Sequence, residues 1–168
     1  MSFSSFINKG SSFFAGRGQD NETSPSATNF FKDDVTPYSL ALVDSVWTQV
    51  NAGLSYSLIL PSSQFTHHIS PDVRITYNGD FALHSINYCV SSLLNSTNHE
   101  VTYAIYVNNG IVVSSTQILG MAQEYISCTG LGMIELDTGD EIRLKVKIDG
   151  GNDTIEIQNI GIVVFQVK

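Results

Sequence analysis

One histidine and one cysteine in the segment GDFALHSINYCVSSLLN, residues 79–95, are of the types that form a nucleophile–base pair. His84 and Cys89 lie five residues apart. The segment is rich in apolar and aromatic residues and is predicted to be a strand, in which residues five apart point to opposite faces. A cysteine nucleophile needs its base within hydrogen-bond reach. We therefore expect His84 and Cys89 not to form a catalytic pair.

The other residues with ligand chemistry have unfavourable spacing. His67 and His68 are adjacent, so they diverge in a strand, and neither has a cysteine or glutamate at metal-site spacing. Two turns offer oxygen ligands for calcium without the EF-hand spacing. Their residues are Asp137, Asp140 and Glu141 in one turn, and Asp149, Asn152 and Asp153 in the other. Polar turns are common in β proteins, so we predict no metal and no cofactor, with a calcium loop as the alternative.

Motifs of the common enzyme classes are absent from the sequence. There is no G-x-S-x-G, H-E-x-x-H or phosphate-binding loop. The acidic residues lie mostly in predicted turns, so no pair of carboxylates can be assigned to glycoside hydrolysis. We predict that the protein is not an enzyme.

The composition limits the partners of this chain. Of 168 residues, 42% are hydrophobic and 14% charged, against about 25% charged in ordinary domains, which indicates a surface partly covered by other protein. The net charge is −8 and the eight Lys and Arg form no basic stripe, so no nucleic-acid partner is expected. No apolar run of membrane-spanning length or Sec signal is present, which predicts synthesis in a cytoplasm without membrane insertion. Cys89 and Cys128 are expected to be buried free thiols, with one bridge between strands as the alternative.

Short strands separated by turns follow one another from about residue 38. In residues 141–149, Ile142, Leu144, Val146 and Ile148 alternate with polar residues, which predicts a half-buried strand. Asn and Gly at 108–110 predict a hairpin over residues 101–116. Further strands are expected at 46–50, 56–60, 65–69, 73–77, 81–94 and 154–168. No helical periodicity with caps occurs, so the fold is predicted to be an all-β antiparallel sandwich or barrel.

Three motifs occur in a recognisable order. They are G-x-F-x-L from Gly79, Y-x-I-Y-x-N-N-G ending at Gly110, and G-D-x-I-x-L-x-V from Gly139, followed by a long apolar strand. This order resembles the C1q/TNF-like jelly roll, and more closely its relatives among bacteriophage structural proteins such as head fibres, spikes and decoration proteins. The resemblance covers residues 46–168 and implies an antiparallel jelly-roll sandwich of eight to ten strands. No collagen-like Gly-X-Y stalk is present, in contrast to the animal C1q members.

The resemblance also implies a homotrimer, and two strands fit this independently. Residues 81–94 and 160–167 are apolar on both faces, whereas a sandwich buries one face of each strand, so a second subunit is expected to cover the other face. We assign Phe81, Leu83 and Cys89 to the sandwich core. The residues assigned to the trimer interface are His84, Ile86, Tyr88, Val90, Ile160, Ile162 and Val164.

Residues 1–37 differ in composition from residues 38–168, the predicted jelly-roll domain. They are rich in Ser, Gly, Asn and Asp, as in a flexible arm, but they also hold six of the nine phenylalanines. Aromatic rings spaced along such an arm can each bury apolar area in a partner. The predicted anchors are Phe3, Phe6, Phe13, Phe14, Phe30 and Phe31.

The resemblance, taken together with the aromatic residues of the arm, implies a structural protein of a virion, made in the host cytoplasm. It would be a trimeric head fibre, spike or decoration protein whose arm attaches it to a capsid, portal or tail component. The alternative is a receptor- or carbohydrate-binding module for host attachment, in which the loops contact a surface glycan or receptor. A third interpretation is a jelly-roll protein that tiles the shell.

Overall fold

The computed structural model describes residues 27–50, 63–68, 73–95, 98–119 and 125–167, and for residues 28–36 the backbone alone. These residues form strands and a single short 3-10 helix. The elements are β1 (Ala27–Leu42), β2 (Thr48–Gln49), β3 (Phe65–His68), β4 (Arg74–Tyr77), β5 (Ala82–Leu94), β6 (Glu100–Val107), β7 (Gly110–Ile111), η1 (Val113–Ser115), β8 (Gln117–Leu119), β9 (Ile126–Leu136), β10 (Glu141–Asp149) and β11 (Asp153–Gln166). Within the described residues, no helix is long and apolar enough to cross a membrane.

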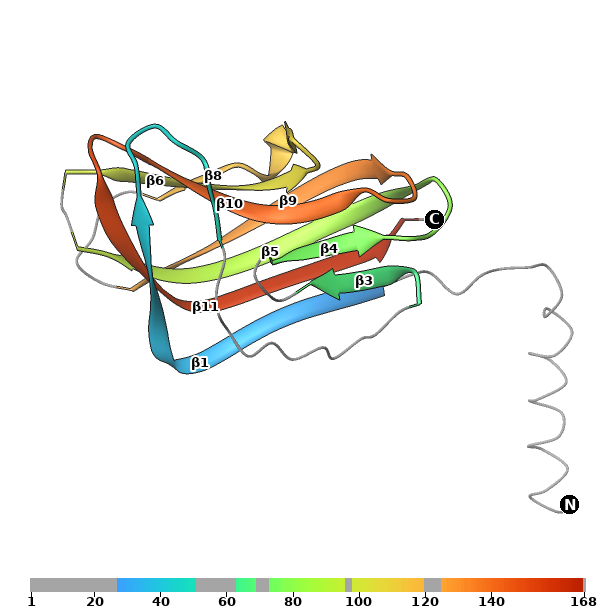
Figure 1. The fold of residues 1–168 in the computed structure, drawn as a ribbon, viewed down its shortest axis with the longest axis horizontal. Coiled ribbons are helices and arrows are strands. Elements are labelled where there is room, and N and C mark those ends of the chain that lie inside the picture. The colour runs from blue at the N-terminus through green and yellow to red at the C-terminus, as the bar shows by residue number, and fades with distance from the viewer. Residues whose placement is uncertain (1–26, 51–62, 69–72, 96–97, 120–124, 168) are drawn as a thin grey trace, which may run out of the picture.

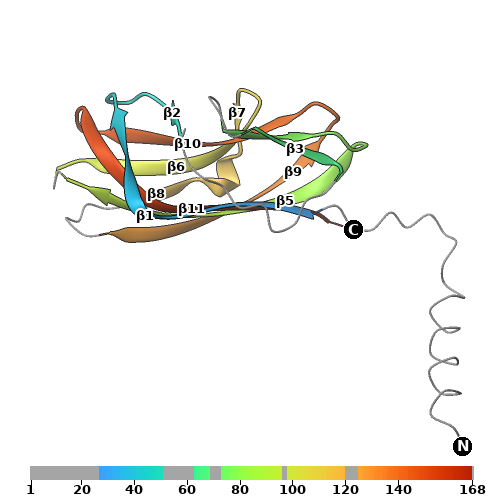
Figure 2. The same ribbon diagram turned by 60° about the horizontal axis from the view of Figure 1, so that its bottom comes forward.

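The strands form two antiparallel sheets that lie face to face (Figures 1 and 2). One sheet has four strands in the order β1-β11-β5-β9. The other has the order β3-β4-β10-β6-β7, with β2 paired to β10 and β8 paired to β6. In Figure 2 β1, β11 and β5 lie in the lower layer, while β2, β10 and β3 lie in the upper one. Neighbouring strands in each sheet are often distant in sequence, as expected of a jelly roll.

The core lies between the two sheets and is filled by alternate residues of each long strand. In β10, Ile142, Leu144, Val146 and Ile148 are buried, and the residues between them are only partly so. The four-stranded sheet contributes its own set from the opposite side: Leu40, Leu42, Ile86, Tyr88, Val90, Leu94, Cys128, Leu136, Ile155, Ile157, Ile160, Ile162 and Val164. Complete burial of one such aliphatic side chain stabilises the fold by about 1.5–3 kcal/mol.

Strand β9 carries glycine at two core-facing positions because another segment occupies the space beneath it. A Cβ on Gly130 would meet the ring of Tyr88 and lie 2.6 Å from the carbonyl oxygen of Ser115, and one on Gly132 would lie 2.7 Å from Val112. Separations this small lie inside van der Waals contact. Glycine at these positions therefore allows the η1 segment to lie beneath the edge strand of the four-stranded sheet.

Several predicted strands coincide with observed ones, and others do not. The segment 141–149 forms β10, and 101–107 lies within β6. The second half of the predicted hairpin is wrong beyond Ile111, because residues 113–115 form η1. Strands β8 and β9 were not predicted. The strand predicted at 56–60 lies outside the described residues.

The N-terminal boundary of the folded domain also differs from the prediction. Strand β1 begins at Ala27 and pairs with β11 from Ala27↔Phe165 to Asp33↔Asn159, then again from Tyr38 to Leu42 after a break in register. Residues 27–37, which the sequence assigned to the arm, thus belong to the four-stranded sheet. The predicted boundary differs because β1 is held in the sheet by backbone pairing with β11, and amino-acid composition does not predict such pairing.

Candidate oligomer interface on the four-stranded sheet

The outer face of the four-stranded sheet is built from the residues that alternate with its core residues. In an antiparallel pair, residues directly opposite each other share a face. The register therefore sets Val163, Asn87 and Leu131 in one row across β11, β5 and β9. The next row contains Phe165 and Met133, with Ser85 between them. We call this surface the outer face of the four-stranded sheet.

Large apolar side chains are exposed on and beside this face. Leu131 and Met133 are each 52% exposed, and Phe81, just before β5, is 61% exposed. The set is Phe81, Leu83, Tyr125, Leu131, Met133, Val163 and Phe165. Several exposed apolar residues on one sheet face favour an interaction site, whereas single exposed apolar residues are ordinary.

Charge is sparse at the centre of the same surface, although Glu156 lies towards one end of it, opposite Leu93. Among the outward positions of residues 83–91, 127–135 and 159–165 in these three strands, Glu135 is the one charged residue. The remaining polar positions are Ser, Thr and Asn. Depletion of charge at the centre of a surface with apolar residues is the compositional mark of a protein–protein interface.

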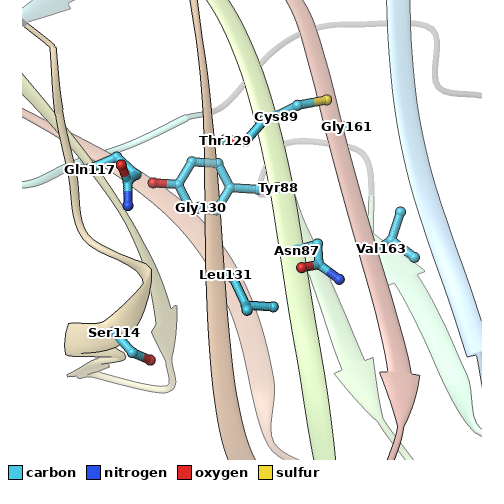
Figure 3. A pocket seen from close by; sticks show the side chains of 10 residues that line it. All are labelled: Asn87, Tyr88, Cys89, Ser114, Gln117, Thr129, Gly130, Leu131, Gly161 and Val163. Atoms are coloured by element: carbon cyan, nitrogen blue, oxygen red, sulfur yellow. The ribbon is translucent and has the colours of Figure 1, made fainter.

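A groove of about 840 Å³ crosses this face near the middle of β5. Its lining includes Asn87, Cys89, Leu131, Gly161 and Val163, and it reaches Ser114 and Gln117 beyond β9. Figure 3 shows Leu131, Asn87 and Val163 projecting from three adjacent strands beside Gly161. Gly161 has no side chain between its neighbours, so the surface is lowest there. The lining is mostly apolar or neutral and holds no ionised group.

The inner wall of the groove is the buried residue Tyr88, which Figure 3 shows beside Gly130. Its hydroxyl donates towards two carbonyl oxygens, that of Ser115 at 2.8 Å and that of Tyr103 at 3.1 Å. Burial raises the pKa of the Tyr88 phenol well above its ordinary value. Tyr88 therefore stays a neutral hydrogen-bond donor and is not a base.

The structure separates His84 from Cys89, as predicted. The His84 ring is fully buried between Phe65 and Tyr77, with ring centroids 6.0 and 4.6 Å away, and its Nδ1 lies 2.9 Å from the Ala82 carbonyl oxygen. Desolvation lowers the pKa of His84, although the Ala82 hydrogen bond opposes this. Cys89 is exposed on the opposite face of β5. A nucleophile–base pair between these two side chains is excluded by this geometry.

The two cysteines are free thiols, as expected, but only one of them is buried. Cys128 lies opposite Val90 in the register and faces the core, whereas Cys89 lies opposite Thr129. Burial raises the pKa of the Cys128 thiol to about 11. Cys128 therefore behaves as a small apolar core residue, and the burial predicted for Cys89 is wrong.

The predicted assignment of the two faces of β5 and β11 is reversed. The residues predicted at the trimer interface all lie in the core of this chain's own sandwich, with exposures from 0% to 4%: His84, Ile86, Tyr88, Val90, Ile160, Ile162 and Val164. Phe81 and Leu83, predicted in the core, are exposed instead. Alternation separates two faces but does not say which one meets the second sheet. A weak signal was present in Ser85, Asn87 and Ser91 on the outer face, since the core-facing side of the same strand carries two polar residues, His84 and Ser92.

The predicted anchoring residues fall into two groups. Phe30 and Phe31 lie within β1, where they are the register partners of Ile162 and Gly161. Phe3, Phe6, Phe13 and Phe14 lie outside the described residues. Sequence reasoning also missed Leu131 and Met133, because it did not predict β9.

The two acidic turns are held by hydrogen bonds within the protein. Asp140 accepts from the backbone of Asp137 and the side chain of Asn108, both at 2.8 Å. Asp149 pairs with Lys147, and Asp153 lies 3.2 Å from His99. In the described ranges, no three His, Cys, Asp or Glu side chains gather as metal ligands would.

Comparisons with known proteins identify solved structures that share this fold. No family model matches the chain, and no curated protein matches it in sequence. Among solved structures, an Eiger TNF from S. frugiperda is similar over 86% of this chain and 93% of its own, with 10% identity and a TM-score of 0.55. The PRD1 vertex protein P5 is similar over 84% of this chain and 96% of its own, with 12% identity and a TM-score of 0.55. These likenesses confirm the predicted fold, an all-β antiparallel jelly roll of the TNF-like kind.

Proposed function

We propose that this protein is a structural component of a virion. Three copies associate through the outer face of the four-stranded sheet, and the residues before β1 attach the trimer to a capsid, portal or tail component. The assembly projects as a head fibre, spike or decoration. The fold shared with a virus vertex protein is consistent with this role. The proposed number of copies, three, is taken from the resemblance to TNF-like jelly rolls.

The observation that carries the proposal is the contrast between apolar exposure and sparse charge on one sheet face. Leu131, Met133, Val163 and Phe165 would each lose exposed apolar area on association, at about 25 cal/mol per Å². Association through this face can give a closed assembly, since a heterologous contact repeated around a threefold axis closes as a ring.

The test is the molar mass of the full chain by multi-angle light scattering at micromolar concentration. We expect three times the 18.3 kDa chain mass. The double variant Leu131→Lys/Met133→Lys places two charges on the apolar face and should elute as a folded monomer. Ile118→Lys is the matched control, because Ile118 is also an exposed apolar residue, at 60%, but lies on the other sheet. A monomeric unmodified chain would refute the proposal.

A further inference from the structure

Basic side chains gather on the opposite side of the molecule, the outer face of the seven-stranded sheet. The chain has a net charge of −8 and only eight Lys and Arg. The four of these whose side chains the structure describes are Arg74 in β4 and Arg143, Lys145 and Lys147 in β10. In β10 they alternate with buried core residues, so all three point away from the core.

Three of these basic side chains take part in ion pairs on this face. Arg74 and Arg143 share one carboxylate, with Glu141 oxygens 2.8 Å from Arg74 Nε and 2.6 Å from Arg143 Nη2. Lys147 Nζ lies 2.6 Å from Asp149. Lys145 lies between Arg143 and Lys147 on the outward side of β10. Four cationic side chains therefore gather on one face of an acidic protein.

An aromatic pair lies among these cations. The rings of Trp47 and Tyr106 meet edge to face, with centroids 5.4 Å apart. Lys145 Nζ lies 4.2 Å from the Tyr106 centroid, and Lys147 Nζ lies 5.9 Å from that of Trp47. Tyr106 is buried, so Trp47, which is partly exposed, presents the accessible ring of the pair. We call these four residues the aromatic–lysine site.

The surroundings of the aromatic–lysine site are open and partly apolar. Val46, next to Trp47, is 49% exposed. Ile118 of β8 pairs with Thr102, which pairs with Lys147, so these side chains form one row across the sheet. The site thus combines a flat accessible ring, an apolar border and two ammonium groups on rigid strands. Ligand sites typically join an apolar or aromatic surface to a few placed polar groups.

We propose that the aromatic–lysine site binds a saccharide that carries a carboxylate, such as a uronic or sialic acid residue. The C–H face of the sugar ring packs on Trp47, and Lys145 pairs with the carboxylate. Lys145 is suited to this because its ammonium group lies over the Tyr106 ring and pairs with no carboxylate among the residues that the structure describes. A charge-assisted hydrogen bond is about twice as strong as a neutral one.

An anionic saccharide fits this surface better than an acidic peptide. The site is the face of a sheet, and an extended peptide gains its backbone hydrogen bonds at a strand edge. A flat ring beside an ammonium group needs no such edge. The proposal goes beyond the virion role, and it requires only that this face stay open, as it does when the outer face of the four-stranded sheet is the one covered.

The test uses the intrinsic fluorescence of Trp47, which is the sole tryptophan in the chain. The full chain is titrated with tri-galacturonate, a hyaluronan tetrasaccharide, and α2,3- and α2,6-sialyllactose, with lactose and cellotriose as neutral counterparts. We expect a saturable change with at least one acidic saccharide, weakened by added salt, and none with the neutral ones. Saturation-transfer NMR should show the sugar C–H protons receiving magnetisation from the protein.

Variants assign the binding to the site. Lys145→Gln should weaken binding about tenfold, the loss of roughly 1.4 kcal/mol, whereas Lys145→Arg keeps the charge and should stay close to the unmodified chain. Arg74→Gln is the matched control, since it removes one positive charge from the same sheet away from the aromatic pair. It should leave binding nearly unchanged.

Four outcomes would overturn the proposal. They are no saturable binding across the acidic panel, equal binding of the neutral saccharides, an unchanged affinity in Lys145→Gln, and equal or tighter binding of poly-glutamate, which would identify an acidic polypeptide as the partner. The molar mass measured by light scattering is a separate readout. An absence of saccharide binding would therefore not contradict the proposed trimer. A monomeric chain would likewise not contradict saccharide binding.

Discussion

Gly130 lies directly against the ring of Tyr88, so that a single added methyl group on Gly130 would overlap the ring. The same methyl group would lie 2.6 Å from the carbonyl oxygen of Ser115, which accepts the Tyr88 hydrogen bond. This contact joins the edge strand β9 to the segment around η1 and forms the inner wall of the groove. The edge of the proposed interface therefore depends on a residue without a side chain.

Replacement of this glycine should destabilise the fold. Gly130→Ala forces Tyr88 or η1 to move, and overpacking of this kind costs about 1–3 kcal/mol in the free energy of unfolding. Urea denaturation followed by circular dichroism measures the change. Gly110→Ala is the control, because the nearest atom to its added Cβ would lie at 3.5 Å, an ordinary contact. Equal stability of the two variants would contradict the packing described here.

The reactivity of the two cysteines should report on association. Cys128 is buried and its pKa is raised to about 11, so at pH 8 almost no thiolate forms and we expect no reaction with an aromatic disulfide reagent. Cys89 lies on the outer face of the four-stranded sheet and should be protected in the assembled protein. In Leu131→Lys/Met133→Lys it should react, giving one thiol per folded chain.

The thiol titration has an internal control in the denatured chain. Denatured chain should give both thiols, since the sequence contains two cysteines. Rapid reaction of Cys89 at concentrations where light scattering shows a trimer would indicate that another surface holds the copies together.

The stability of the protein should decrease as the pH falls below about 6.5, in part because of His84. Desolvation lowers the pKa of His84 from its ordinary value of 6.5. Between the lowered pKa and 6.5, the unfolded chain takes up a proton that the folded chain does not, so acid favours unfolding. His67, whose pKa burial also lowers, acts in the same direction. Urea denaturation at several pH values between 5 and 7.5 measures the trend.

Substitution of His84 separates its share of this pH dependence. His84→Phe keeps a ring between Phe65 and Tyr77 and removes the titrating group, so the slope of stability against pH should become shallower. His67→Gln removes the second histidine whose pKa burial lowers, and it should make the slope shallower by a share of its own. An unchanged slope in His84→Phe would mean that another group controls the acid response.

Truncation should distinguish the proposed arm from the folded domain. Deletion of residues 2–26 removes Phe3, Phe6, Phe13 and Phe14 and leaves β1 intact. We expect a stable trimer that no longer cosediments with the particle. Deletion of residues 2–37 also removes residues 27–37 of β1 and their pairing with β11 from Ala27 to Asp33, so it should lower the thermal unfolding temperature. Undiminished particle binding by the shorter deletion would refute the anchoring role.

Strands in which apolar and polar residues alternate strictly were predicted from the sequence, and β10 is the clearest case. Its four core residues alternate without a break, so both its bounds and its buried face were predicted. Strand β9 escaped prediction because its core-facing positions include Gly130 and Gly132, which are small to accommodate η1 and Tyr88. No pattern within β9 contains that information, because the requirement comes from residues 15 or more positions away in the chain.

The sequence alone determined that apolar residues occur on both faces of β5 and β11, that His84 and Cys89 point apart, and that the chain is all-β. These follow from the two-residue period of a strand, which is local. The period left a sandwich or a barrel open, and the resemblance to a jelly roll favoured the sandwich. Only the tertiary structure decided which face is the core, since that depends on where β10 and β6 lie. It also placed residues 27–37 in a sheet and brought Trp47 against Tyr106, through contacts between segments that composition and period do not connect.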